Sequence, residues 1–274
     1  MTSRPGGGRL RALRLPAQSP LSTPLEANLL ALRQALSSAT LAAGREPEAV
    51  HLLAVTKSVS PELAAALARL GQHELGENRL EGLSAKHAHL AAEGLAVRWH
   101  FIGKLQRNKA RRVVRLADEI HSVDSLRLLQ TLDRVAAEEQ RRPRVHLEVK
   151  LSEDEEKHGL SPAELREAVL AAVDLEHLEL VGLMTLATRP GPGVDAAAAA
   201  REEFETLARL ARELEDDAAT RAAFQAGRVR LSMGMSGDWT EAVAAGSDMI
   251  RIGTALFVGV EDPGRTRHAG GGAA

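Results

Sequence analysis

Short apolar runs rich in β-branched residues alternate along the chain with longer stretches in which apolar residues recur at helical spacing. The short runs predict buried strands, and the longer stretches predict helices that pack on the outside of a sheet. The predicted strands are HLLAVT (51–56), HELGE (73–77), RWHFI (98–102), EIHSV (119–123), RVHLEV (144–149), LELVGLM (178–184), RVRLSM (228–233) and DMIRIG (248–253).

Eight strands that each run into a helix or loop predict the α/β class and a (β/α)8 TIM barrel. A doubly wound open sheet is the competing fold, but no G-x-G-x-x-G motif follows the first predicted strand. The stretch from Pro24 to Gly44 predicts one extra helix ahead of that strand. We therefore expect a single barrel domain over residues 23–260, between a disordered arm at 1–22 and a disordered tail at 261–274.

Small polar residues mark the expected helix starts. Ser60-Pro61 and Ser161-Pro162 each place a serine cap before a proline in the first turn. Asp124 and Asp238 are predicted to cap two further helices. The apolar spacing of segment 196–217 predicts an exposed helix of the outer ring.

Composition and charge argue against several classes of function. The 274 residues suit one barrel, and a formal net charge of −2 offers no field for nucleic acid or a membrane surface. No apolar run reaches the ~20 residues that a membrane helix needs. The chain has no cysteine, which excludes disulfides and thiolate metal sites and fits the reducing cytoplasm.

Two further signals are interpreted as structural. The pair His87-x-His89 has no further ligands nearby in the sequence, so no metal site is predicted there or elsewhere. The basic run 104–115 contains no interleaved aromatic residue, so it predicts a solvated helix face in place of a nucleic-acid site.

A lysine follows the first predicted strand. Lys57 comes directly after the apolar run LLAV, and only Lys57 and Lys150 among the six lysines end a predicted strand. The chemistry of a (β/α)8 barrel gathers at the carboxyl ends of its strands. A low-dielectric barrel mouth favours the neutral amine, which is the form that attacks an aldehyde to give a Schiff base. A lysine that snorkels from a strand edge explains the same position without a ligand.

The segments after the last two strands carry glycines and hydroxyls suited to an anion. LSMGMSGD follows the seventh strand and Gly253-Thr254 follows the eighth. Loops at these two places recurrently hold phosphate in this fold, although a plain turn explains each loop alone. Arg251, on the eighth strand, needs an acceptor if it points inward, and either a pyridine nitrogen or a structural salt bridge would supply one.

Taken together, these segments resemble the pyridoxal phosphate homeostasis protein family, single-domain relatives of the alanine racemase barrel. The matching pieces run in order from about residue 50 to 259. They are AVTK (54–57), GENR (76–79), HFIGKLQRNK (100–109), EKHGL (156–160), GLMT (182–185) and LSMGMSGDWTEAVAAGSDMIRIGTALFVG (231–259).

The resemblance implies that the chain binds pyridoxal 5′-phosphate (PLP), with Lys57 as the Schiff-base lysine and Arg251 facing the pyridine nitrogen. It implies a phosphate site formed by Ser232, Ser236, Gly253 and Thr254. It implies a ring pocket lined by Asn78, His100 and Met184. The chain departs from the family pattern in two places: Glu81 and Gly82 follow Leu80 after the GENR motif, and Lys150 stands where the fifth strand usually ends in Asn.

The implied function is non-catalytic: intracellular PLP homeostasis by a cytoplasmic monomer that stores the cofactor and passes it to PLP-dependent apo-enzymes. The alternative is a PLP-dependent amino-acid racemase or a related enzyme. Related racemases use a tyrosine from a second domain and related decarboxylases use a cysteine, whereas this chain has neither residue and ends just after the expected barrel. An arginine beside the pyridine nitrogen is also a poor acid, which weakens the ring as an electron sink. We therefore expect no enzymatic turnover.

Overall fold

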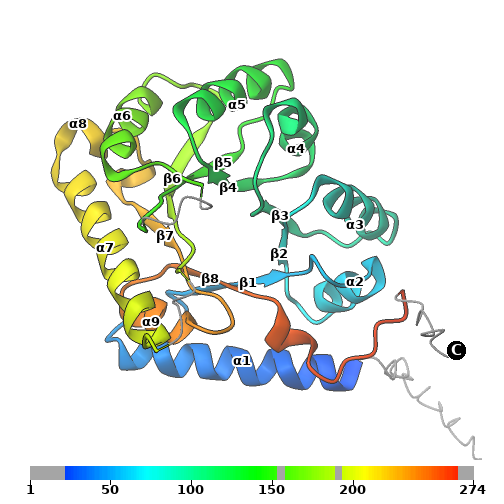
Figure 1. Cartoon of the computed structure of the whole chain (residues 1–274). Coiled ribbons are helices and arrows are strands. Elements are labelled where there is room, and N and C mark those ends of the chain that lie inside the picture. The colour runs from blue at the N-terminus through cyan, green and yellow to red at the C-terminus, as the bar shows by residue number, and fades with distance from the viewer. Residues whose placement is uncertain (1–21, 153–157, 189–192, 265–274) are drawn as a thin grey trace, which may run out of the picture.

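Eight parallel strands close into a barrel in chain order, so that β8 pairs with β1 (Figure 1). The computed structural model describes residues 22–152, 158–188 and 193–264. The predicted (β/α)8 barrel is confirmed, and every predicted strand is present with ends that differ by no more than two residues. The strands are β1 (His51–Val55), β2 (Glu74–Glu77), β3 (Arg98–Phe101), β4 (Glu119–Val123), β5 (Arg144–Glu148), β6 (Glu179–Met184), β7 (Arg230–Ser232) and β8 (Met249–Ile252).

Helices surround the barrel and connect successive strands (Figure 1). This outer layer consists of α2 (Pro61–Arg69), α3 (Leu80–Ala92), η1 (Arg107–Lys109), α4 (Ala110–Leu116), α5 (Leu126–Glu138), α6 (Pro162–Ala172), α7 (Ala196–Asp216), α8 (Ala218–Arg221), η2 (Gln225–Gly227) and α9 (Trp239–Ala244). The helix predicted at 196–217 is α7, which buries Phe204 and Leu207 and exposes its charged face.

The N-terminal helix α1 (Ser22–Ala42) completes this outer layer. β8 is followed only by the short 3-10 helix η3 (Thr254–Phe257), and α1 packs against η3 and α9 (Figure 1). The Asn28 side chain donates to the carbonyls of Leu256, at 3.1 Å, and Val258, at 2.8 Å. The predicted extra helix is therefore confirmed, and it occupies the place beside β8 that an eighth crossover helix would fill.

Both chain ends were expected to be disordered. The expected arm at 1–22 lies outside the described residues, apart from Ser22, which begins α1. The expected tail at 261–274 lies outside them beyond residue 264, while the Asp262 carboxylate accepts a hydrogen bond of 2.9 Å from the Ser60 backbone N–H. None of the helices in the described ranges has the length and apolar character needed to span a bilayer.

The capping predictions are partly confirmed. Ser60 caps α2, and Ser161 forms a reciprocal capping box with Glu164 at the start of α6. Asp124 was the wrong residue, because the hydroxyl of Ser125 accepts the backbone N–H of Leu128 instead. Asp238 occupies the N-cap position of α9 but makes no capping hydrogen bond to that helix.

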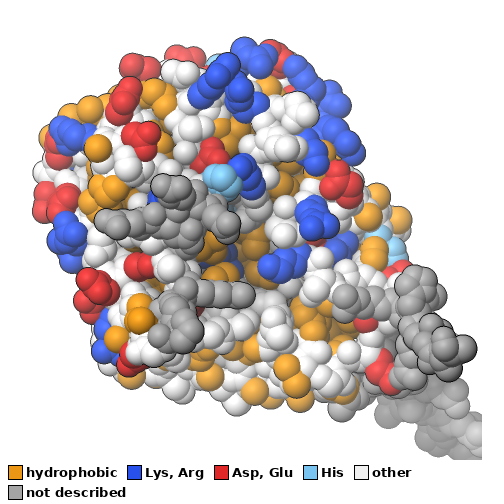
Figure 2. Space-filling view, viewed as in Figure 1, with side chains coloured by type: hydrophobic (Ala, Val, Ile, Leu, Met, Phe, Trp, Pro, Cys, Tyr) orange, Lys and Arg blue, Asp and Glu red, His pale blue; other side chains and the backbone are white. Residues whose placement is uncertain are grey.

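The basic run forms an exposed helix face, as predicted. Figure 2 shows Lys and Arg side chains gathered over α4 and its neighbours. Arg111 and Arg115 on this helix are exposed and pair with Glu138, the last residue of α5, and with Glu139 that follows it, while Val113 on the other face is buried. These basic residues therefore link two helices at the surface.

The two faces of the strands differ in chemistry. Residues such as Leu52 and Ala54 of β1 face outward and join the apolar core beneath the helices. The inward face carries several polar side chains: His121 of β4 contacts Ser232 of β7, and because these strands are not neighbours, both side chains lie inside the barrel. Branched aliphatic residues usually fill such an interior. The polar filling is therefore the feature of this barrel that leads to its site.

Candidate functional site

Lys57 lies at the carboxyl end of β1. Leu53 pairs in register with Arg251, whose side chain lies inside the barrel, and Lys57 stands in the turn that follows β1. Lys57 is nevertheless exposed. The expectation of a desolvated amine is wrong for this structure, because the side chain starts two residues beyond the last residue of β1, past the apolar layer.

The loop after β7 has a conformation that only glycine permits at its first turn. Gly234 has a φ of +96°, and a Cβ on this residue would lie 2.6 Å from the Cβ of Ala242. The Asp238 carboxylate then accepts the backbone N–H of Met235 at 2.5 Å and closes the turn. Ser236 is held exposed at the tip of this turn.

The loops after β7 and β8 are tied to each other and to β1. The backbone N–H of Arg251 donates to the carbonyl of Gly234 at 2.9 Å. A Cβ on Gly253 would lie 3.2 Å from the carbonyl oxygen of Val55, so the start of the last loop lies against the end of β1. Thr254 follows and is exposed. Lys57 and the predicted phosphate loops therefore belong to the same end of the barrel.

Arg251 is a buried cation beneath this mouth, with only 4% of its surface exposed. Its guanidinium donates to the carbonyl of Ser232 at 2.6 Å, to the hydroxyl of Ser232 at 2.8 Å and to the carbonyl of Thr185 at 2.8 Å. Burial lowers the pKa of Arg251 to about 10, although the charges of Asp238 and Glu148 act in the opposite direction. Within the described ranges no carboxylate forms an ion pair with it, so the salt-bridge alternative for Arg251 finds no support there.

The two remaining predicted pocket residues on strands are buried. Met184 ends β6 with 1% of its surface exposed, and His100 on β3 is fully buried. Asn78, just after β2, is half-buried beside Gly103, where a Cβ would lie only 2.1 Å from the Asn78 carbonyl oxygen. The predicted site residues therefore differ in burial: some are exposed in the loops at the mouth, and others are buried on the strands beneath it.

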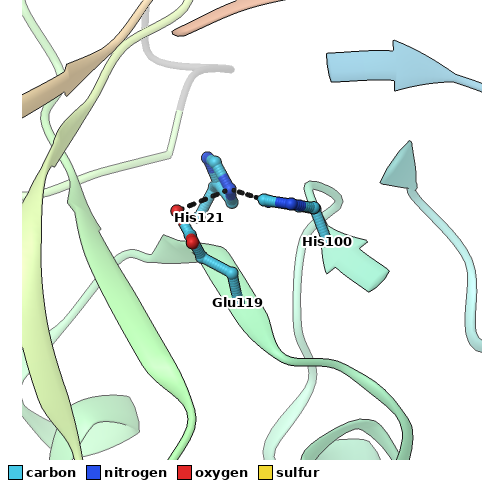
Figure 3. A group of neighbouring side chains, drawn as sticks. All are labelled: His100, Glu119 and His121. Carbon is cyan, nitrogen blue, oxygen red and sulfur yellow. Dashed lines mark hydrogen bonds and ion pairs between the residues drawn. The ribbon is translucent and has the colours of Figure 1, made fainter. Parts of the chain in front are cut away.

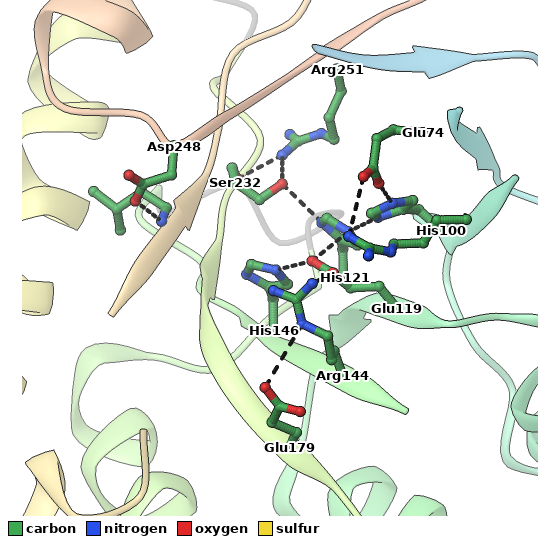
Figure 4. A network of polar contacts seen from close by, with 12 residues as sticks. Glu74, His100, Glu119, His121, Arg144, His146, Glu179, Ser232, Asp248 and Arg251 are labelled. Atoms are coloured by element: carbon green, nitrogen blue, oxygen red, sulfur yellow. Dashed lines mark hydrogen bonds and ion pairs between the residues drawn. The ribbon is translucent and has the colours of Figure 1, made fainter. Parts of the chain in front are cut away.

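A hydrogen-bonded chain inside the barrel was not predicted. His100 contacts the Glu74 carboxylate through Nε2, and its Nδ1 lies 2.9 Å from Nε2 of His121. His121 Nδ1 lies 2.9 Å from the hydroxyl of Ser232, which accepts from Arg251 (Figure 4). We call Glu74, His100, His121, Ser232 and Arg251 the interior chain. The sequence did carry a signal for it, since all five residues occupy inward positions of their strands.

A second polar group lies beside the interior chain. The Glu119 carboxylate accepts from His146 Nε2 at 2.6 Å and pairs with Arg144 at 3.0 Å (Figure 4). Burial alone would raise the pKa of Glu119, but the hydrogen bond from His146 and the neighbouring histidines hold it well below its ordinary value. Burial, followed by the charge of His146, lowers the pKa of His121 well below its ordinary value, which favours the neutral ring.

One trio in this interior has the composition of a metal site. Ligand atoms of His100, Glu119 and His121 all lie within 4.8 Å of one another, and all three side chains are buried (Figure 3). The two histidine nitrogens are also in direct hydrogen-bond contact at 2.9 Å, which requires a proton between them. A metal ion would have to replace that proton, so the present geometry is that of a hydrogen bond.

Lys150 and Glu148 add charge near the mouth. Lys150, the residue that departs from the family pattern, is half-buried and lines an open pocket of about 480 Å³ with Asp124 and His158. Burial, reinforced by the charge of Asp124, raises the pKa of Glu148 to about 7. Glu148 is therefore a carboxyl group that titrates near neutral pH at the level of Met184, its register partner on β6.

Sequence comparisons relate this chain to one family of known proteins. The sequence model of the alanine racemase N-terminal domain family matches residues 25–261. The pyridoxal phosphate homeostasis protein of Escherichia coli strain K12 is 35% identical over 237 residues, which cover 84% of this chain and 94% of that protein. The pyridoxal phosphate homeostasis protein of Synechocystis is 38% identical over 214 residues, which cover 77% and 92%.

Solved structures similar to this chain come from the same family and from alanine racemases. PipY of Synechococcus elongatus, solved with PLP bound, superposes with a TM-score of 0.72 at 36% identity and covers 85% of this chain and 99% of its own. Alanine racemase from Corynebacterium glutamicum, at 15% identity and a TM-score of 0.60, shares the fold.

The fold and the strand-end residues thus define a barrel of the alanine racemase N-terminal type. Within that class, the chain belongs to the pyridoxal phosphate homeostasis protein family.

Proposed function

We propose that this protein binds PLP at the barrel mouth and acts in PLP homeostasis, holding the cofactor as a Schiff base on Lys57. The observation that carries the proposal is the buried Arg251 cation, which has no carboxylate partner in the described ranges and lies beneath a mouth bearing an exposed amine. The acceptors of Arg251 described above are neutral carbonyl and hydroxyl oxygens, and a ligand with an aromatic nitrogen and an anionic group would supply a further acceptor and a negative charge. PipY, a relative at 36% identity, was solved with PLP bound.

The residues at the mouth fit the chemical parts of PLP. When bound, PLP supplies an aldehyde that condenses with an amine. The exposed Lys57 amine is assigned to that bond, and the phosphate is assigned to Ser236, Gly253 and Thr254 in the loops after β7 and β8. Asn78, just after β2, and Met184, at the end of β6, are assigned to the ring.

Ser232 and His100 are assigned roles here that differ from those implied by the family resemblance. Ser232 is fully buried and its hydroxyl is engaged by His121 and Arg251, so we assign it to supporting Arg251 and not to the phosphate. Both ring nitrogens of His100 are engaged as well, so its contribution to a ring pocket would come from its carbon atoms.

A role in cofactor handling is better supported than catalysis. The guanidinium of Arg251 donates hydrogen bonds but is a poor acid, and the sequence contains no tyrosine or cysteine to move a proton at the mouth. The relatives above are named for homeostasis. With several amino acids as substrates, we expect racemisation and decarboxylation to stay below the ordinary enzyme range; a kcat of about 1 s⁻¹ or faster would establish an enzyme.

Titration with PLP tests binding directly. Wild-type protein and Lys150→Ala should develop a saturable visible absorption band, whereas Lys57→Ala should not. Loss of the band in Lys150→Ala, with its persistence in Lys57→Ala, would contradict the assignment. We also propose that the protein is a cytoplasmic monomer that delivers PLP to apo-enzymes. Sedimentation tests the monomeric state, and reactivation of a PLP-dependent apo-enzyme tests the delivery.

A further inference from the structure

We propose that the interior chain is a hydrogen-bond relay of one fixed direction, which orients Arg251 from the opposite end of the barrel and so controls the ring nitrogen of the bound cofactor. This inference rests on the proposed function for its effect on PLP. The direction of the relay itself follows from the protein's own residues.

The direction is set at Ser232. Its hydroxyl oxygen has two contacts, with Arg251 Nη1 at 2.8 Å and with His121 Nδ1 at 2.9 Å. A guanidinium can only donate, so of these two contacts only His121 Nδ1 can accept the serine hydrogen, and this arrangement gives that hydrogen its acceptor. That nitrogen is therefore an acceptor, and the hydrogen of the neutral His121 ring must be on Nε2.

The same reasoning fixes the remaining links. His121 Nε2–H donates to His100 Nδ1, 2.9 Å away, which makes that nitrogen an acceptor. The hydrogen of His100 is then on Nε2 and points to the Glu74 carboxylate, which can only accept while it is ionised. Every donor has one acceptor, and all donors point from the mouth toward Glu74.

The relay connects the mouth to the other end of the barrel. Glu74 is the first residue of β2, and its side chain is 23% exposed beside Arg98. Burial alone would raise the pKa of Glu74, but the contact with His100 lowers it below its ordinary value, so the accepting end stays ionised at neutral pH. An anion at one end and a guanidinium at the other favour this single polarity.

Reversal of the relay would disturb Arg251. If His121 carried its hydrogen on Nδ1, it would donate to Ser232, and the serine hydrogen would have to turn toward another group. The only other contact of that hydroxyl in the described ranges is the Nη1 donor of Arg251, so the oxygen would accept from both groups and the serine hydrogen would lose its acceptor. The His121 tautomer therefore determines whether the hydroxyl that holds Arg251, together with the carbonyls of Ser232 and Thr185, has its own hydrogen bonded.

Glu119 and its partners are the nearest groups that could compete. Glu119 Oε1 lies 3.5 Å from His121 Nε2, farther than His100 Nδ1, and already accepts from His146. Its other oxygen pairs with Arg144. A divalent cation held by His100, Glu119 and His121 is the competing interpretation, and it excludes the relay because the proton between the two rings would be lost.

The relay is tested first in protein without added PLP, by long-range ¹H–¹⁵N NMR of the histidine rings. We expect the ring hydrogen of both His100 and His121 on Nε2, with both Nδ1 atoms as acceptors. His121 protonated on Nδ1 would overturn the relay. So would Zn²⁺ that stays bound after dialysis and shifts both rings, since it would indicate a metal centre.

The second test uses matched carboxylates at the far end of the barrel. Glu74→Leu removes the final acceptor, Glu74→Gln keeps an acceptor oxygen, and Glu179→Leu removes a carboxylate of similar exposure, 24%, outside the relay. After PLP is added, we expect Glu74→Leu to shift the pH midpoint of the visible band by about one unit, a tenfold change in proton affinity. Glu74→Gln and Glu179→Leu should stay near wild type.

The outcomes separate the two proposals. Equal midpoints in Glu74→Leu and Glu179→Leu, in folded proteins that bind PLP, would overturn the relay while leaving PLP binding intact. Absence of a visible band in wild-type protein would refute the proposed function, and the tautomer measurement would still decide the direction of the relay. Circular dichroism of each variant identifies any that fail to fold, in which case Ser232→Ala against Ser247→Ala, a buried serine outside the relay, replaces the comparison.

Discussion

Replacing Glu148 by glutamine should stabilise the protein at alkaline pH and leave it nearly unchanged at acid pH. Glu148 ends β5 inside the barrel mouth, where burial and then the charge of Asp124 raise its pKa to about 7, while the charges of Arg251 and Lys104 oppose the rise. The ordinary value is 4.5. The folded protein therefore binds this proton more tightly than the unfolded chain does.

The sign and size of the effect follow from linkage. The stabilisation contributed by the protonated carboxyl is complete below pH 4.5 and is lost as the pH rises through 7. A difference of about 2.5 units corresponds to about 3 kcal/mol of unfolding free energy lost between these limits. Glutamine has nearly the same size and no charge, so Glu148→Gln should be about 3 kcal/mol more stable than wild type at pH 8.

Urea unfolding of protein freed of PLP, at pH 5 and pH 8, measures this difference. Glu167→Gln on α6 is the control, because Glu167 is exposed and its replacement should leave the pH dependence unchanged. If the gap between wild type and Glu148→Gln were the same at both pH values, Glu148 would not be titrating in the folded state and the reasoning would be refuted.

Two further predictions concern the scaffold that holds the mouth. Gly234→Ala should cost on the order of 2 kcal/mol or more, because φ is +96° and the new Cβ would meet Ala242; Gly94→Ala, with a φ of +70° and free space, should cost about 1 kcal/mol. Equal losses in the two variants would show that the loop after β7 adapts. Lys86→Met should cost about 3–5 kcal/mol, because it leaves the Glu77 carboxylate, paired with Lys86 at 2.8 Å, as an unpaired buried charge. Denaturant unfolding should show most of that loss recovered in Glu77→Gln/Lys86→Met, and no recovery would mean that the pair contributes through packing alone.

The fold was predictable because local pattern and global architecture agree in this chain. Each strand is a short apolar run bounded by polar residues, and the outward residues that pack under the helices, such as Leu52 and Ala54, made those runs visible. Ser60 and Ser161 marked helix starts because a proline follows each of them. Asp124 misled because the next residue, Ser125, is an equally good cap.

The mouth was predictable by position, and the interior was not. Lys57, Ser236 and Thr254 follow strand ends, where this fold collects its ligand-binding groups. The exposure of Lys57 was missed because the apolarity of LLAV describes the strand and not the space beyond it.

The interior chain depends on closure of the sheet. A histidine at position 121 and a serine at position 232 are 111 residues apart and become partners only when β4 and β7 face each other across the barrel. Sequence alternation gives the side of the strand on which each residue lies but not which residue lies opposite.

The most direct measurement of the central claim is the site of covalent attachment. Protein incubated with PLP and reduced with borohydride should carry one stable phosphopyridoxyl label, and mass spectrometry of its peptides should map that label to Lys57. A label on Lys150, or spread evenly over exposed lysines, would contradict the account.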